Sequence, residues 1–494
     1  MTPGVPPLVQ ARSVLSLLLA LTVARGLANV WLDPLPLSGD EAQYWIYGEH
    51  LAGGYYSKPP LLPWLIRAST ELFGDSAWAI RLPSLLLHPL IAVGLYALGR
   101  VLFDRVVGLV AALIYLTLPA VTVSSMLAST DPPMMLGWAF ATLALVIALR
   151  GGQASAWLLT GAAVGLGFLG KYTMVAWLGG AGLVLLLDPH WRRGVSWRGL
   201  GLALVAAVVM LSPNLIWNAR AGFPTLRHLG ENANVPAGGD AALAERAAEL
   251  GDFLVSQIGV FGPITFGILV VMLFTPGTWR SPALRLLLGL GLPLLLIIAA
   301  QAWLNRANAN WAAPAYLGFS VAVAAWLVAG GRRWLLRTSV AVHLAAFVVA
   351  VAAASLNAAE PSAYSRSVDP FKRLRGIDRI AAEVQPVLEA EPDAWLVVSD
   401  RMLLSSLLHG TGWPLERSAT FDWDQRVNNH FDMVTAFPGD PDAVFVIVET
   451  HEDLRFITMR FREVETVIDT RLRTHDDRSI PFRVLFARGF QGYG

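Results

Sequence analysis

The chain has 494 residues and a mean hydropathy of +0.53, and only 15% of its residues are charged, whereas soluble domains carry about 25%. This composition argues against a wholly soluble enzyme. The absence of cysteine excludes disulfides, thiolate zinc sites and cysteine nucleophiles, and a net charge of +1 gives no electrostatic reason to expect nucleic acid as a partner.

The charged residues divide the chain into two parts. Residues 1–359 hold 35 of the 73 Asp, Glu, Lys and Arg residues, and residues 360–494 hold the other 38. The charged fractions are therefore about 10% and about 28%, which are typical of a membrane domain and a soluble domain. We expect a polytopic helical membrane domain over 1–359 and a soluble α/β domain over 360–494.

The first part contains eleven apolar stretches, each close to the length of about 20 residues that spans a bilayer. Arg25 interrupts the first stretch and no clear small-residue cleavage site follows it, so we expect a retained helix instead of a signal peptide. The count changes by one or two if residues 155–187 are divided differently. The stretches lie near 11–32, 79–103, 106–123, 133–149, 155–170, 172–187, 199–217, 252–274, 283–302, 309–329 and 334–355.

Basic residues in short loops predict the orientation, because they favour the cytoplasmic side. With eleven spans and a cytoplasmic N-terminus, every inner loop is rich in arginine and only Asp104 and Asp188 are acidic there. The long loops 33–78 and 218–251 and the C-terminal domain then lie outside. The inner arginines are Arg100, Arg105, Arg150, Arg192, Arg193, Arg198, Arg280, Arg285, Arg332, Arg333 and Arg337.

The C-terminal part has the pattern of a small α/β domain. Short apolar runs at Ala394–Ser399, Ala443–Val448 and Phe482–Ala487 predict buried strands, and Arg366–Leu388 has helical spacing. Its histidines lack metal-ligand spacing. We expect this domain to close over a cavity or to help select an acceptor without supplying a catalytic group, although a purely stabilising cap explains the same pattern almost equally well.

The first outer loop places ionisable residues beside the membrane. Asp40 and Glu41 follow Ser38, an arrangement that is also typical of a helix N-terminus with a capping serine. Lys58 precedes Pro59 and another proline, which stiffen the backbone and would aim the side chain reproducibly. A lysine that only extends to the lipid headgroups is an equally good interpretation.

More polar residues are predicted at the same membrane face. Asp131 begins the fourth span before two prolines, which is also a common helix start. Lys171 lies between two apolar stretches, and the next outer turn contains Arg306, Asn308 and Trp311. Because a charge at the centre of a span costs at least about 2.5–3.5 kcal/mol, ionisable residues near the membrane indicate function. Their gathering at one face is more informative than any one of them.

Two carboxylates beside cationic groups at a membrane surface suit one reaction in particular. A carboxylate can remove the proton of an acceptor hydroxyl as a general base. Lysine and arginine can neutralise the phosphate that leaves a lipid-linked sugar. The pattern therefore predicts sugar transfer from a polyprenyl phosphate.

The motifs around these residues resemble the bacterial glycosyltransferase 39-type family, which has the GT-C fold. That family includes aminoarabinose transferases, galacturonic acid transferases of lipopolysaccharide and protein O-mannosyltransferases. Each motif alone is weak, but their order along the chain is fairly specific. They are Asp40-Glu41 with Tyr44, Lys58-Pro59-Pro60-Leu61, Ser129-Thr130-Asp131-Pro132, Gly170-Lys171-Tyr172-Thr173, Ser212-Pro213-Asn214-Leu215, Phe223-Pro224-Thr225 and Asn310-Trp311-Ala312-Ala313-Pro314-Ala315-Tyr316, with Ser399-Asp400-Arg401 and Asn428-Asn429-His430-Phe431-Asp432 in the soluble domain.

The resemblance implies roles for these residues. Asp40 would be the catalytic base, with Glu41 as the fallback, and Asp131 the second acid of the site. The donor phosphate would bind Lys58, assisted by Lys171 or Arg306, and other substrate contacts would come from Glu41, Tyr44, Tyr55, Tyr56, Asn308, Trp311 and Tyr316. Aminoarabinose transferases usually have a metal-associated glutamate before the lysine, whereas this chain has Ser57. The sequence therefore gives no support for a metal or other cofactor, although a divalent metal fits the family, and it argues against aminoarabinose as the sugar.

These observations predict an inverting glycosyltransferase of the bacterial inner membrane, with its site and C-terminal domain in the periplasm. It would move a sugar from a polyprenyl phosphate to lipid A or another envelope glycan. The expected polyprenyl carrier is undecaprenyl phosphate. A protein O-glycosyltransferase is the alternative among enzymes. A transporter or flippase of lipid-linked sugars is the alternative from another class, but it should place charges near the midplane and show repeat symmetry, and the sequence has neither pattern.

Overall fold

The computed structural model describes most of the chain. The described residues are 11–31, 35–225, 227, 243–356, 362, 364–367, 369, 371–372, 374–421, 426–435 and 437–493. Residues 226 and 228–242 of the expected outer loop 218–251 lie outside these ranges.

Two compact units account for the chain. Unit 1 comprises Met1–Val30, Lys58–Leu62 and Arg81–Val351, and unit 2 comprises Trp31–Ser57, Pro63–Ile80 and Ala352–Gly494. Most of the first outer loop thus clusters with the C-terminal part, whereas composition groups it with the membrane helices. The domain limit at residues 359 and 360 stays a prediction.

Unit 1 is a bundle of apolar helices, and each of the eleven predicted apolar stretches forms a helix or a helix pair. In the described part of the chain, six helices are long and apolar enough to span a membrane, and the bent pair α13 and α14 would be a seventh. The six are α1 (Ala11–Trp31), α4 (Ala77–Leu102), α7 (Asp131–Gly151), α11 (Trp197–Arg220), α16 (Pro282–Leu304) and α18 (Arg333–Leu356). The protein is therefore a multi-span helical membrane protein.

The other predicted stretches form shorter helices. The four shorter apolar elements are α5 (Arg105–Thr117) with the following α6 (Pro119–Ser124), α8 (Ala154–Gly170), α9 (Val175–Leu187) preceded by the 3-10 turn η1 (Tyr172–Met174), and α17 (Ala315–Ala329). The bent pair consists of α13 (Leu243–Phe261) and α14 (Pro263–Leu273). The chain bends by 113° between these two helices. Gly262 separates them with a φ of +81°, and Pro263 begins the second helix.

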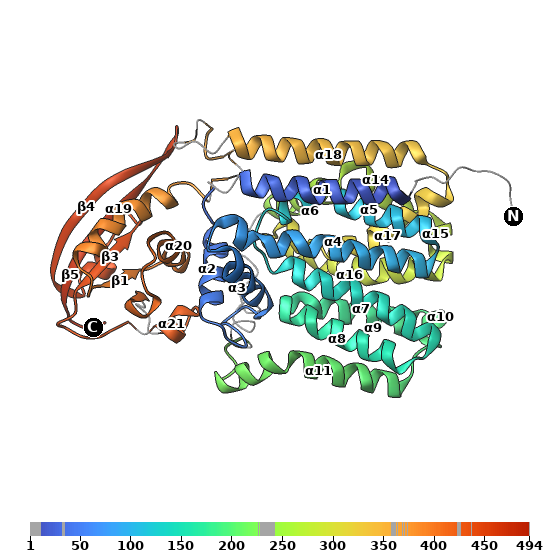
Figure 1. Cartoon of the computed structure of the whole chain (residues 1–494), viewed down its shortest axis with the longest axis horizontal. Helices are drawn as coiled ribbons and strands as arrows, with labels where there is room; N and C mark the ends of the chain where they lie inside the picture. The colour runs from blue at the N-terminus through green and yellow to red at the C-terminus, as the bar shows by residue number, and fades with distance from the viewer. Residues whose placement is uncertain are drawn as a thin grey trace. The chain divides into compact units, whose positions relative to one another are not determined.

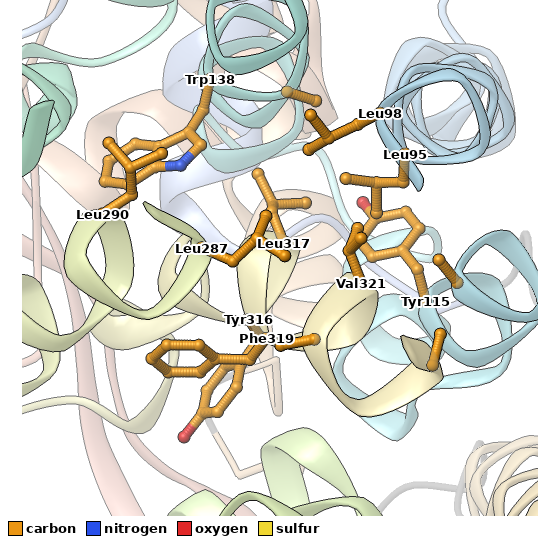
Figure 2. Close-up of a cluster of buried hydrophobic side chains, with 14 of the residues drawn as sticks. Leu95, Leu98, Tyr115, Trp138, Leu287, Leu290, Tyr316, Leu317, Phe319 and Val321 are labelled. Atoms are coloured by element: carbon orange, nitrogen blue, oxygen red, sulfur yellow. The ribbon is translucent and has the colours of Figure 1, made fainter. Parts of the chain in front are cut away.

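The core of unit 1 forms where helices are apolar on every side. Almost all of α5 and α17 is buried, as expected for helices without a polar face. Figure 2 shows Leu95 and Leu98 of α4 together with Tyr115, Trp138 and Leu317 in one cluster. By contrast, only 11% of the apolar window of α11 is buried, which leaves that helix largely facing outward.

Two short helices that each end in an arginine lie at one end of this bundle. Helices α10 (Pro189–Arg192) and α15 (Pro276–Arg280) lie at the same end in Figure 1. Asp188 accepts a hydrogen bond from the His190 backbone and forms an ion pair with Arg285, with 2.7 Å between Oδ2 and Nε. This hydrogen-bonded ion pair lowers the pKa of Asp188. Asp104 caps α5 through Val107 N.

Unit 2 contains a mixed five-stranded sheet in the order β2-β1-β3-β5-β4. The three strands β1 (Trp395–Val398), β2 (Ser418–Thr420) and β3 (Phe445–Glu449) are parallel, and β5 (Arg478–Phe490) pairs antiparallel with β3 and with β4 (Phe461–His475). The three predicted strands coincide with β1, β3 and β5. The predicted α/β domain is thus confirmed as a mixed β-sheet domain.

Helices complete unit 2, and one of them corrects the sequence analysis. Helix α19 (Ile377–Ala390) begins at Ile377, not at Arg366, because Gly376 before it has a left-handed φ of +85°. The remaining helices are α2 (Gly39–Glu49), α3 (Leu61–Phe73), α20 (Arg401–Thr411) and the short α21 (Phe431–Val434) and α22 (Arg455–Thr458).

Candidate active site

A carboxylate with two partners lies at one end of the bundle of unit 1. Asp131 is the first residue of α7 and is buried. Its Oδ1 accepts a hydrogen bond from Lys171 Nζ at 2.7 Å, and its Oδ2 accepts one from Asn310 Nδ2 at 2.9 Å. The proline-rich helix start was predicted, but these oxygens bind side chains from two other elements. We call Asp131, Lys171 and Asn310 the carboxylate cluster.

Close packing of α7 and α8 brings Asp131 and Lys171 together. A Cβ atom on Gly137 would lie 2.5 Å from the Gly167 Cα atom. A Cβ atom on Gly170, the last residue of α8, would lie 2.5 Å from Met134 N. Because these glycines lack side chains, the two helices approach closely enough for the residue after α8 to reach the residue that begins α7.

Asn310 is held by a residue that sequence reasoning missed. Asn310 lies in the 3-10 turn η2 (Ala309–Ala312). Gln257 of α13 is fully buried, and its Nε2 donates to the Ala309 carbonyl at 3.2 Å while its Oε1 accepts from the Tyr316 hydroxyl at 2.9 Å. An uncharged polar residue inside an apolar stretch was the one available signal for Gln257. Its bonds attach the turn to α13 and α17.

The other predicted site residues of unit 1 differ in how far their side chains are exposed. Arg306 and Asn308 are exposed and Trp311 is 38% exposed, so their side chains are accessible. Tyr316 is buried and stacks on Phe261 with 4.4 Å between ring centroids. The contact of Tyr316 with substrate stays a prediction. Lys58 is half-buried and begins the segment Lys58–Leu62 of unit 1, and its contact with the donor phosphate also stays a prediction.

The predicted acids of the first loop begin α2, in unit 2. Ser38 Oγ accepts from Glu41 N at 3.3 Å, and Glu41 Oε2 accepts from Ser38 N at 3.0 Å, which together form a capping box. Glu41 is buried and its carboxylate completes this cap, and its contact with substrate stays a prediction. Asp40 is exposed in the first turn, and its carboxylate is the more accessible of the two.

Helix α2 packs against the start of α20. Gly39 permits this contact, since a Cβ atom there would lie 2.5 Å from Met402 Cβ. Arg401 Nη1 donates to Gln43 Oε1 at 2.7 Å. Gln43 follows Asp40 by three residues and therefore shares a helix face with it. The C-terminal part of unit 2 thus brings a cation next to the helix that carries Asp40, a contact that no sequence pattern predicted.

Aromatic residues of the first loop form the rest of this region. The rings of Tyr47 and Tyr55 stack at 4.3 Å, and His430 lies edge-on to both at 4.9 and 5.1 Å. Burial raises the pKa of both tyrosines and lowers the pKa of His430 to about 4. Tyr44 and Tyr56, predicted to contact substrate, are also buried. Within the described residues, no three His, Cys, Asp or Glu side chains are arranged to hold a metal ion.

Known proteins are similar to this chain over much of its length. Residues 57–217 match the model of the dolichyl-phosphate-mannose-protein mannosyltransferase family. The lipid A galacturonosyltransferase RgtD of Rhizobium johnstonii is 35% identical over 327 residues, which cover 64% of this chain and 66% of that protein. The lipopolysaccharide core galacturonosyltransferase RgtA of the same organism is 31% identical over 191 residues, or 37% of each chain. The alignments therefore span less than two thirds of these relatives.

Solved structures show the same fold. The crystal structure of ArnT from Cupriavidus metallidurans in the apo state has a TM-score of 0.66 at 16% identity and covers 96% of this chain and 98% of that one. ArnT bound to undecaprenyl phosphate has a TM-score of 0.65 and covers 97% and 98%. At this identity, the match concerns the fold alone.

Proposed function

We propose that this chain, which belongs through residues 57–217 to the dolichyl-phosphate-mannose-protein mannosyltransferase family, is a membrane glycosyltransferase that uses a polyprenyl-phosphate sugar. The observation that carries the proposal is the carboxylate cluster, in which Asp131 is buried beside Lys171 at 2.7 Å. Ionisable residues that lie largely buried at the end of an apolar helix bundle indicate a functional site in a membrane protein.

The chemistry requires a base and groups that stabilise a leaving phosphate. Asp40 would take the proton from the acceptor hydroxyl, because its exposed carboxylate is accessible. The acceptor oxygen would then bond to the anomeric carbon with inversion, and the carbon–oxygen bond to the phosphate would break with its electron pair going to the phosphate. Lys58 and Arg306 are the proposed phosphate contacts. Lys171 is a weaker contact, since Asp131 already neutralises its charge.

The proposed topology has eleven spans. The six long helices, the bent pair and the four shorter apolar elements together match the eleven predicted stretches. Arginine-rich loops would face the cytoplasm. The N-terminus would then be cytoplasmic, and the carboxylate cluster and unit 2 would face the periplasm of a bacterial inner membrane.

Galacturonic acid and lipid A are the proposed sugar and acceptor. The support is the 35% identity to lipid A galacturonosyltransferase RgtD over 327 residues. An undecaprenyl phosphate-alpha-4-amino-4-deoxy-L-arabinose arabinosyl transferase of Pseudomonas aeruginosa is 32% identical over only 186 residues, or 36% of this chain and 32% of that protein. Ser57 stands where aminoarabinose transferases are expected to have glutamate.

The test is transfer by the purified protein in lipid nanodiscs. Undecaprenyl-phosphate galacturonic acid and lipid A are supplied, and the products are identified by mass spectrometry, with Asp40→Asn as the inactive control. Galacturonosylated lipid A is the expected product. Sugar on a polypeptide instead would indicate a protein O-glycosyltransferase. Movement of donor across liposomes without transfer to any acceptor would identify a flippase and overturn the proposal.

A further inference from the structure

Arg401 of the soluble domain points its guanidinium at α2. Its Nη1 donates to Gln43 Oε1 at 2.7 Å, and the side chain is only half-buried. Among the described residues, no carboxylate lies within ion-pair distance of Arg401. An arginine has five N–H donors in a planar fork, so most of its donors stay available.

Gln43 adds a donor that the protein does not use. Gln43 is fully buried, and its Nε2 has no hydrogen-bond partner among the described residues. The bond from Arg401 identifies the other end of the amide as the oxygen, so the unpaired end is the NH₂ group. An unpaired buried donor costs about 1–3 kcal/mol, and a bound acceptor would remove that cost.

Both donors lie close to the proposed base. Asp40 and Gln43 are one helical turn apart on α2 and share a face. Arg401 and Asp40 both interact electrostatically with Tyr47, one further turn along the helix. A group that binds Arg401 and Gln43 would therefore lie beside the carboxylate that accepts the proton.

We propose that Arg401 and Gln43 form a binding site for an anionic oxygen group of a substrate, a carboxylate or a phosphate, beside Asp40. The inference rests on the proposed function and deepens it. The planar fork of Arg401 suits two parallel hydrogen bonds to such a group. Two sources carry this chemistry: the carboxylate of a uronic acid on the donor, and a phosphate on the acceptor.

The site would also select between sugars of opposite charge. A guanidinium attracts a uronic acid and repels the ammonium group of an amino sugar, and selectivity can come from repulsion as well as attraction. Arg401 is therefore a residue that favours a galacturonic acid donor over an aminoarabinose donor, provided that the donor is the source of the anion.

The experiment uses the full chain in nanodiscs and compares wild type with Arg401→Gln and Gln43→Leu. Arg379→Gln is the matched control, because Arg379 lies in the same domain and donates to the Arg473 carbonyl. Donor binding without acceptor is measured for undecaprenyl-phosphate galacturonic acid and for its neutral counterpart, undecaprenyl-phosphate galactose. Transfer is then measured with lipid A that has or lacks its phosphates.

Two results support the site and identify its source. Weaker binding of the galacturonic acid donor in Arg401→Gln, by about 10- to 100-fold, with galactose donor binding unchanged, assigns the donor carboxylate. Unchanged donor binding with a similar rise in the KM for phosphorylated lipid A alone assigns the acceptor phosphate. Gln43→Leu should show a smaller effect in the same direction, and Arg379→Gln should show none.

The opposite result is equally defined. If Arg401→Gln changes none of these quantities, or lowers all of them equally along with the thermal stability, Arg401 only fastens α2 to α20 and the inference is wrong. Thermal stabilisation of the protein by free galacturonate or inorganic phosphate, compared between wild type and Arg401→Gln, tests the site without transfer. A wild type that transfers no sugar but shows this arginine-dependent stabilisation would refute the proposed function and keep the site.

Discussion

The Asp131 carboxylate binds the side chains of both Lys171 and Asn310. Variants of this cluster can therefore distinguish a structural role of Asp131 from a catalytic one. Asp131→Asn should lower the free energy of unfolding by about 1–3 kcal/mol, because the ammonium group of Lys171 loses its counter-ion in a partly buried place. Adding Lys171→Met removes that unpaired charge and should restore stability. Thermal unfolding and sugar transfer are measured for both variants. If the double variant regains transfer as well, the pair has only a structural role.

Asp40 and Glu41 are adjacent in sequence but should respond differently to the same change. Asp40→Asn should lower turnover by about 10²–10⁴-fold if Asp40 is the base, with little change in stability because the side chain is exposed. Glu41→Gln weakens the capping box and should cost about 0.5–2 kcal/mol of stability with a smaller loss of turnover. Kinetics and thermal unfolding of both variants measure the contrast. Wild-type turnover in a folded Asp40→Asn protein would remove Asp40 from this role.

His430 makes unit 2 sensitive to acid. Burial, with His50 nearby, lowers its pKa to about 4 in the folded protein, whereas an unfolded histidine has a pKa of about 6.5. Above pH 6.5 both states are neutral and stability is unaffected. As the pH falls from about 6.5 to about 4, only the unfolded state gains the proton, so up to about 3 kcal/mol of stability is lost. Thermal unfolding between pH 7 and 4 should show this slope, and His430→Gln should flatten it.

At the scale of elements, the contact between α7 and α8 determines the geometry of the carboxylate cluster. Gly137→Ala would push a methyl group into the Gly167 backbone, which cannot rotate away, so the Asp131–Lys171 pair should separate and transfer should fall by about tenfold or more. Gly179→Ala is the control, because nothing lies within 4 Å of a Cβ atom at Gly179 in α9. Equal activity of the two variants would mean that α7 and α8 adjust without effect on the site.

Hydrophobic patterns within short segments of the sequence predicted most of the membrane helices and three strands of the sheet. Hydrophobicity alone located the membrane helices, and short apolar runs located β1, β3 and β5. Strand β4 was missed because most of Phe461–His475 is exposed and its charged residues hide the alternation of a half-buried strand. The start of α19 was misjudged since the charges before Ile377 fit a helix, whereas Gly376, with its left-handed φ, directly precedes the first helical residue.

Sequence patterns did not predict which side chains from distant segments bind one another. Asp131 and Lys171 were predicted to share a membrane face, and they form an ion pair at 2.7 Å. The bond from Arg401 to Gln43 joins residues 358 positions apart, and no local periodicity indicates it. The same holds for Gln257, whose partner Ala309 lies 52 positions away. The family resemblance is confirmed, whereas the roles of the individual site residues stay predictions.

At the scale of the whole molecule, the lengths of α8 and α9 have a consequence for the lipid around them. Both helices expose leucines, including Leu159 and Leu186, yet α8 has 17 residues and η1 and α9 together have 16. At 1.5 Å per residue they reach about 25 Å, which is less than the hydrocarbon thickness of about 30 Å. In the proposed topology, we expect the membrane beside Lys171 to become thinner to meet them.

A thin membrane at that place would lower the headgroups, and with them the phosphate of an arriving lipid donor, toward the carboxylate cluster. Transfer should consequently depend on bilayer thickness and fall in proteoliposomes as acyl chains lengthen from 14 to 22 carbons, since each additional ångström of mismatch costs a fraction of a kcal/mol. A rate that is independent of chain length, with equal reconstitution, would contradict this. If transfer does depend on acyl-chain length, the thickness of the surrounding membrane determines how often a donor phosphate reaches the depth of Lys171. A change in membrane thickness would then change the transfer rate as a change in donor concentration does.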